Sequence, residues 1–139
     1  PMKRTNLSRR VSLQARNGIK PVTRNKQVRV PPTWRQDVAD MHGTWCIVCH
    51  EPAQDAHHLL TAGSLRRELS HLASPELEAI LGDPRNGAPM CRTCHERHHS
   101  RARPIPRAAL RPSVFVFAAD HGLEWLLDRC YPNDEESAA

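Results

Sequence analysis

Hydrophobic positions along this 139-residue chain are spaced for several short helices rather than for one long element. The clearest case lies near the C-terminus, where the 0, 3, 4, 7 spacing of an amphipathic helix is met by Leu123, Leu126, Leu127 and Cys130. Residues 112–131 therefore predict two short helices joined at His121-Gly122. Their apolar face favours core packing, with a dimer interface as the alternative, and core packing would bury the Cys130 thiol.

An earlier helix is indicated just after Pro31-Pro32. Thr33 followed by Gln36 has the form of a capping box, and Gly43 is a suitable C-terminal stop. The helix should run to about Met41. Its core-facing side would carry Trp34, Val38 and Met41.

The central segment alternates between strand, loop and helix signals. We expect a strand over residues 54–60, mixed structure over 61–85, a loop over 86–89 and a helix over about 91–101. Ser74-Pro75-Glu76 is a favourable helix start, because proline is tolerated in the first turn and an acid there complements the helix dipole. That helix should end near Leu81-Gly82.

Charge divides the chain into two parts. The net charge is +5, yet residues 1–36 hold ten of the twenty lysines and arginines and none of the fifteen acids. The remainder is therefore mildly acidic. A basic arm suits phosphate backbones, and Arg9 and Arg10 are its candidate DNA contacts. A solvated tail is the alternative interpretation.

Size and composition predict one small domain between two tails. We place the arm at 1–30, the domain at 31–131 and an acidic tail at 132–139. Aromatic residues make up only 4% and mean hydropathy is −0.61, so a small core should need a metal to hold it. The polar start and the lack of a long apolar run predict a cytoplasmic protein without membrane partners.

Two cysteine pairs form the strongest motif. Pairs of the form Cys-x-x-Cys, separated by about forty residues, are typical of a structural zinc site with four thiolate ligands. The residues are Cys46, Cys49, Cys91 and Cys94. A redox pair is the alternative, but no βαβ pattern accompanies the cysteines.

Histidines outside these pairs indicate a second, chemically active centre. His95 and His99 are four residues apart on a predicted helix, so their imidazoles share one face and form half of a divalent-cation site. His57 and His58 are neighbours on a predicted strand and should point to opposite sides. One can complete the metal site while the other acts as general base, since histidine titrates near neutrality.

Together these segments resemble a known motif. Asp55-Ala56-His57-His58-Leu59, then Asn86, then Cys91-x-x-Cys94-His95-x-x-x-His99 is similar to the zinc-ribbon form of the HNH endonuclease motif. The basic start and small size also resemble HNH proteins of bacteriophages. The resemblance covers residues 46–99.

The resemblance implies an α+β fold: a ββα-metal (His-Me finger) core with added helices. It makes His58 the general base, Asn86 the residue that orients the base-bearing strand, and His57, His95 and His99 the cation ligands. The cation could be Mg²⁺, Mn²⁺, Ni²⁺ or Zn²⁺, beside the structural Zn²⁺. It would contact the scissile phosphate and the 3′ oxygen, leaving 5′-phosphate and 3′-hydroxyl ends. The interval from His58 to Asn86 is longer than is usual in the family, because of the predicted helix at 74–82.

These expectations describe a hydrolase that nicks or cuts double-stranded or branched DNA. Arg92 and Arg97, near the predicted ligands, are candidate phosphate clamps, with plain surface arginines as the alternative. A phage protein of this kind would act in the host cytoplasm with phage DNA-processing proteins. The rival interpretations are a non-catalytic zinc-ribbon DNA-binding protein and a junction-resolving recombination nuclease.

Overall fold

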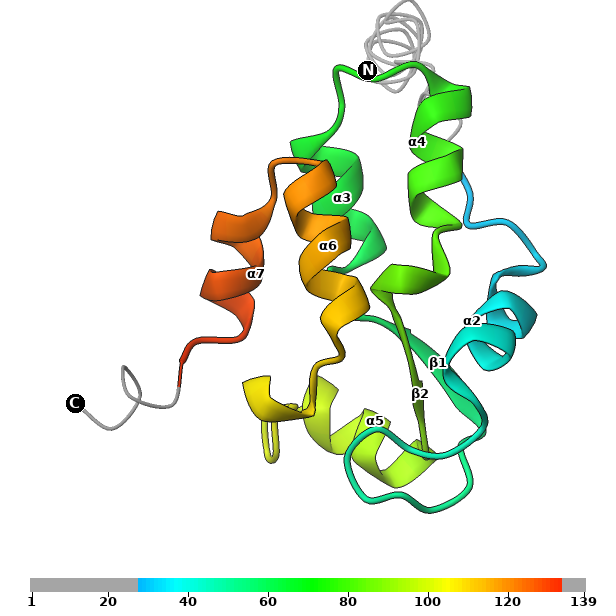
Figure 1. Ribbon diagram of the computed structural model, residues 1–139, viewed down its shortest axis with the longest axis vertical. Coiled ribbons are helices and arrows are strands. Elements are labelled where there is room, and N and C mark those ends of the chain that lie inside the picture. The colour runs from blue at the N-terminus through cyan, green and yellow to red at the C-terminus, as the bar shows by residue number, and fades with distance from the viewer. Residues whose placement is uncertain (1–27, 134–139) are drawn as a thin grey trace, which may run out of the picture.

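The computed structural model describes residues 28–133, and most of the arm, including Arg9 and Arg10, and most of the acidic tail lie outside them. The described part is a small α+β unit with six α-helices, two 3₁₀ turns and two strands (Figure 1). In chain order these are α2 (Trp34–His42), β1 (Asp55–His58), α3 (Ala62–Glu68), α4 (Ser74–Leu81), η1 (Pro84–Asn86), β2 (Gly87–Met90), α5 (Arg92–His99), η2 (Arg107–Ala109), α6 (Pro112–Asp120) and α7 (Glu124–Cys130).

The two strands form an antiparallel hairpin at the centre of the unit. Asp55 pairs with Met90 at one end and His58 with Gly87 at the other. Helix α2 packs on this hairpin, α5 contacts β1, and α6 packs on η1, with α7 beside α6 (Figure 1). The hairpin thus brings the histidine pair of β1 next to the helix that carries His95 and His99.

The prediction of a loop over residues 86–89 was wrong, because Gly87–Met90 is strand β2. A glycine and a proline would normally weaken a strand. Here the missing side chain of Gly87 is required, since a Cβ atom would collide with Val38 of α2. Pro89 gives up one donor, yet its carbonyl still accepts a hydrogen bond from the Ile47 N–H at 2.9 Å.

Helix α2 agrees with its prediction except at two points. Gly43 ends it with φ of +84°, and Trp34 and Val38 are buried. No capping box forms, because the Thr33 hydroxyl donates to the Asp37 carboxylate at 3.3 Å. Met41 is 50% exposed, and the third buried position of the helix is His42, whose Nε2 bonds the Pro84 carbonyl at 2.8 Å.

Two helices, not one, occupy the interval between the strands. Helix α4 begins at Ser74 and ends at Leu81, as predicted. Helix α3 is additional: the Thr61 hydroxyl caps it by accepting the Ser64 N–H at 3.1 Å, and Leu65 is fully buried. Nearby, Arg66 Nε donates to the Val28 carbonyl at 2.9 Å, and the Val28 side chain packs against the hydrophobic core.

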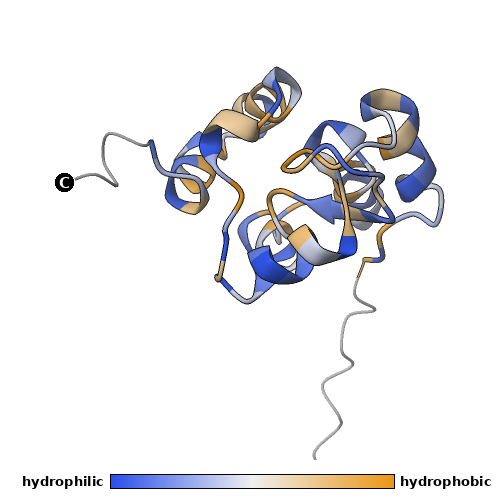
Figure 2. Cartoon of the chain, turned by 90° about the horizontal axis from the view of Figure 1, so that it is seen from below, coloured by the Kyte–Doolittle hydropathy of each residue, from blue (hydrophilic) through white to orange (hydrophobic). Residues whose placement is uncertain are grey.

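The two C-terminal helices are confirmed, joined at Gly122 with φ of +65°. Both combine hydrophobic and hydrophilic stretches (Figure 2). Three of the four predicted core residues are buried, but Cys130 is exposed, so its prediction as a buried thiol was wrong. Tyr131 is buried instead, and its hydroxyl donates to the Leu59 carbonyl at 2.7 Å, which ties the end of α7 to the chain just after β1.

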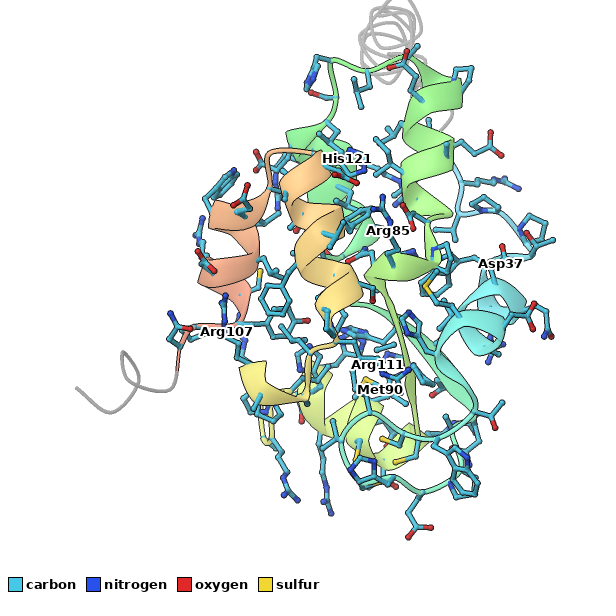
Figure 3. The ribbon with its side chains drawn as sticks, in the orientation of Figure 1. Asp37, Arg85, Met90, Arg107, Arg111 and His121 are labelled. Carbon is cyan, nitrogen blue, oxygen red and sulfur yellow. The ribbon has the colours of Figure 1, made fainter. Side chains whose placement is uncertain are left out.

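Ion pairs fasten α6 to the turn that precedes β2. The Arg85 guanidinium contacts Asp83 and Asp120, each at 2.7 Å, and it lies between η1 and α6 in Figure 3. Within residues 28–133, no helix has the length and apolar character needed to cross a membrane.

Candidate metal centres and active-site pocket

The four cysteines of the paired motif converge on one point. Cys46 and Cys49 lie on the turn between α2 and β1, which closes through the Cys46 N–H to the Glu51 carbonyl at 2.7 Å. Cys91 caps α5, and Cys94 is in its first turn. All four sulfurs lie within 4.8 Å of one another, and Cys49 Sγ is 3.6 Å from Cys91 Sγ. Zinc–sulfur bonds of about 2.3 Å place tetrahedral ligands about 3.8 Å apart, so the cluster is consistent with structural zinc.

The environment of the thiols suits a cation as well. Burial, followed by the neighbouring thiols, raises the pKa of Cys94 to about 12. Burial also acts on Cys46, but backbone N–H groups outweigh it and lower the pKa of that thiol to about 7. Four thiols so close cannot all ionise without compensation, and a bound divalent ion would supply it by stabilising the thiolates.

A second group of possible ligands consists of His57 from β1 with His95 and His99 from α5. Their nitrogens lie within 4.8 Å of one another, and the Nε2 atoms of His95 and His99 are 2.9 Å apart. Metal–imidazole bonds of about 2.1 Å place neighbouring octahedral ligands about 3.0 Å apart, which matches this separation. This group could therefore bind a metal.

His57 has a buried ring nitrogen whose surroundings suit a metal ion. Its Nε2 is fully buried, yet it has no hydrogen-bond partner within residues 28–133. Burial, and then the nearby His98, His95 and His99, lower the pKa of His57 to about 3. The imidazole is therefore neutral at physiological pH, with a lone pair available. Because an unpaired buried polar atom is costly, a cation here would satisfy it.

Asp55 sets the orientation of His95, a role that the sequence analysis missed. The Asp55 carboxylate can only accept, so His95 Nδ1 donates to it at 3.1 Å and His95 Nε2 keeps its lone pair for a cation. The strand alternation could have indicated this role, because Asp55 precedes His57 by two residues and residues two apart on a strand share a face. Arg35 and Arg92 flank the same carboxylate, each at 3.8 Å.

His98 is not one of these possible ligands, although its ring lies against that of His57 with the centroids 4.8 Å apart. Its Nδ1 accepts the Ile105 N–H at 3.0 Å, so one ring nitrogen already has a backbone partner. Its ring also lies parallel to that of Tyr131, with the centroids 6.2 Å apart.

His58 points away from His57, to the other side of the strand. Its ring lies flat against the Trp34 indole, with centroids 3.6 Å apart and planes 3° from parallel. Its Nε2 lies 3.0 Å from the Leu81 carbonyl, which can only accept, so Nε2 carries the proton and Nδ1 is the basic atom. Burial, only partly offset by this hydrogen bond, lowers the pKa of His58 below its ordinary value. Neither partner was anticipated from the sequence, because both lie far from His58 along the chain.

Asn86 is fully buried and clamps the chain two residues beyond His58. Its Oδ1 accepts the Leu60 N–H and its Nδ2 donates to the Leu60 carbonyl, both at 2.8 Å. Its own carbonyl accepts the Leu59 N–H at 2.9 Å. The side chain therefore does more than fill a turn: it joins the end of β1 to the start of β2.

The three histidines that could bind a metal and His58 border one hollow of about 240 Å³. Its lining consists of Ala56, His57, His58, Thr61, Ala62, His95 and His99. The predicted phosphate clamps are absent from this lining: Arg92 and Arg97 line a different hollow, above the cysteine cluster.

Comparisons of the chain with protein-family models, curated proteins and solved structures found no match.

Proposed function

We propose that this protein is a metal-dependent DNA endonuclease of the HNH type. One observation carries the proposal: a single hollow is bordered both by three imidazoles that could bind a metal and by His58, whose Nδ1 is left as a base. A purely structural metal site would not need a separate histidine beside it. The resemblance of residues 46–99 to the zinc-ribbon HNH motif supports the same function.

The arrangement of elements is what a ββα-metal core requires. A hairpin is followed at once by α5, with one ligand on the first strand and two on the helix. The cysteine cluster connects the turn before β1 to the start of α5. In this role, structural zinc would hold the helix against the hairpin and so keep the three imidazoles together.

The proposed chemistry uses the residues that line the hollow. A divalent cation bound by His57, His95 and His99 would act as a Lewis acid on the scissile phosphate and stabilise the leaving oxygen. His58 Nδ1 accepts a proton from water while the water oxygen attacks phosphorus. The bond from phosphorus to the 3′ oxygen breaks, and that oxygen takes a proton from solvent. The Leu81 carbonyl and the Trp34 ring hold the base in place throughout.

The ligand set also bears on which cation is used. Three imidazole ligands suit first-row transition metals, whereas Mg²⁺ prefers oxygen ligands. We therefore expect Mn²⁺, Ni²⁺ or Zn²⁺ to support cleavage better than Mg²⁺.

The test uses supercoiled plasmid and a four-way junction, each incubated with Mg²⁺, Mn²⁺ or Ni²⁺. His58→Ala should retain zinc and DNA binding but cleave about 10²–10⁴-fold more slowly, the usual loss for a general base. His57→Ala should instead weaken the catalytic cation, and excess metal should partly restore its rate.

His71→Ala is the matched control, since His71 is exposed and lies outside the hollow. Cleavage by His58→Ala at the parent rate would refute the assignment of the base. A protein that binds DNA but cuts neither substrate with any of the metals would instead be the zinc-ribbon binding protein. Cleavage of the junction alone would favour the junction-resolving nuclease.

A further inference from the structure

A hollow larger than the one beside the histidines lies over the cysteine cluster. Its volume is about 710 Å³, against about 240 Å³ for the histidine hollow, and the two share no lining residue. It is lined by Cys49, Glu51, Pro52, Gln54, Cys91, Arg92, Thr93, Cys94, Arg97 and Arg103. The proposed catalytic chemistry makes no use of this surface.

The surface around this hollow has positive charge that nearby acids do not neutralise. Between residues 92 and 103 the chain has four exposed arginines (Arg92, Arg97, Arg101 and Arg103) and one acid, Glu96. Within residues 28–133, only Arg92 of these four has a carboxylate within 4.0 Å, that of Asp55. Arg85 and Arg107, in contrast, are held by carboxylates at 2.7 Å and 2.9 Å.

Backbone hydrogen bonds fix where these arginines lie. After α5 the chain turns back, with the Arg101 N–H donating to the His98 carbonyl and the Arg103 N–H to the Arg97 carbonyl, each at 3.1 Å. Ile105 is buried and anchors the end of this turn. Arg103 is therefore held beside Arg97 on a fixed surface.

The two hollows lie on different sides of α5. Each residue of an α-helix is rotated by about 100° from the last, so Arg97 lies about 200° from both His95 and His99. Arg97 therefore does not contact the phosphate at the histidine centre. Arg92, one turn before His95 and two turns before His99, borders the hollow over the cysteine cluster while it also contacts Asp55.

We infer that the arginine hollow over the cysteine cluster is a second, non-catalytic site that binds the phosphodiester backbone of duplex DNA. Guanidinium groups on a concave surface fit phosphate oxygens by charge and by paired hydrogen bonds. In this proposal, bound DNA crosses α5 from the hollow beside the histidines to the hollow lined by the arginines. The cysteine cluster holds the start of α5, the helix that borders both hollows. The inference rests on the proposed function only for the identity of its ligand, duplex DNA.

The experiment measures binding of a short fluorescent DNA duplex by anisotropy at several salt concentrations. The zinc-loaded protein is used without added divalent cation, so the duplex stays intact. The test variant carries Arg97→Gln, Arg101→Gln and Arg103→Gln together. A second triple variant carries lysine at the same positions and keeps the charge. Arg129→Gln is the matched control, because Arg129 is exposed, does not line the hollow and belongs to α7, which lies beside α6 and away from α5 (Figure 1).

The salt slope is the slope of log affinity against log salt concentration. Each lost phosphate contact should reduce its magnitude by about 0.9 and the affinity at 0.1 M salt by about eightfold. The glutamine triple variant should therefore bind roughly 10²–10³-fold more weakly if all three arginines bind phosphates. The lysine variant should keep most of the slope, and the control should match the parent. If the glutamine variant loses its zinc, the single Arg97→Gln and Arg103→Gln changes decide the question, each with the slope change of one contact.

The inference is overturned if the glutamine triple variant binds with the parent's affinity and salt slope, or if Arg129→Gln weakens binding as much. A parent protein that binds DNA through this hollow but never cleaves it would refute the nuclease proposal alone.

Discussion

Replacing Asn86 with alanine should destabilise the protein far more than a turn residue would. The side chain is fully buried and makes two hydrogen bonds of 2.8 Å, one with the N–H and one with the carbonyl of Leu60, which is itself fully buried. Asn86→Ala removes both partners and leaves two backbone groups in the core without hydrogen bonds. Water cannot reach them unless the end of β1 separates from the start of β2.

The magnitude follows from those two groups. An unsatisfied buried donor or acceptor typically costs about 1–3 kcal/mol, so the loss should be about 2–6 kcal/mol. Domains of this size are stable by only about 5–15 kcal/mol, so the variant should lose a large share of its stability. The same separation would displace His58, two residues before Leu60, and the cleavage rate per folded molecule should fall as well.

The assay is urea unfolding of zinc-loaded protein, followed by circular dichroism, with the free energy extrapolated to zero denaturant. Asn133→Ala is the control, because that asparagine is exposed near the end of the described chain. Its free energy of unfolding should match the parent's. A cost below about 1 kcal/mol for Asn86→Ala would refute the reasoning, since an ordinary surface turn residue would give that value.

Three further predictions follow from the two metal centres and from His58. Cys46→Ser should lose the structural zinc and unfold the domain, whereas Cys130→Ser should keep one zinc per chain. Elemental analysis measures the zinc content and circular dichroism measures the folding. A parent protein that is folded without zinc would contradict the prediction for Cys46. The cleavage rate should hold as the pH falls through about 6.5, the ordinary histidine value, and decline only below it, because burial lowers the pKa of His58 and the base must be neutral; a pH–rate midpoint above that value would count against His58. Trp34→Leu should lower kcat roughly two- to tenfold relative to Trp34→Phe, with KM unchanged, because phenylalanine keeps a ring against His58. Equal kcat values for the two variants would mean that the stacking does not position His58.

Local spacing along the chain was enough to predict the two cysteine pairs and the pairing of His95 with His99, whereas the choice of His57 over His58 as the third possible ligand came from the resemblance. The cysteines of each pair are three positions apart and so share a turn, and the interval from His95 to His99 is one turn of helix. The strand period placed His57 and His58 on opposite sides before any contact was known. Proline and acid signals likewise located α4, because such signals act within a single helical turn.

Pairing between distant segments was decided only by the tertiary structure. Gly87–Met90 has the composition of a loop, and it becomes a strand because β1 and Val38 lie against it. Met41 and Cys130 match apolar faces, yet they are exposed because the core ends at His42 and Tyr131 instead.

The division is sharpest at His58. The alternation of a strand, which can be read from the sequence alone, determined that one histidine of the pair would point away from the histidines that could bind a metal. Only the fold supplied the Leu81 carbonyl and the Trp34 ring, which set the tautomer and plane of His58. Backbone geometry repeats every few residues and can be read along the chain, whereas the partners of a buried side chain depend on which distant segments pack around it.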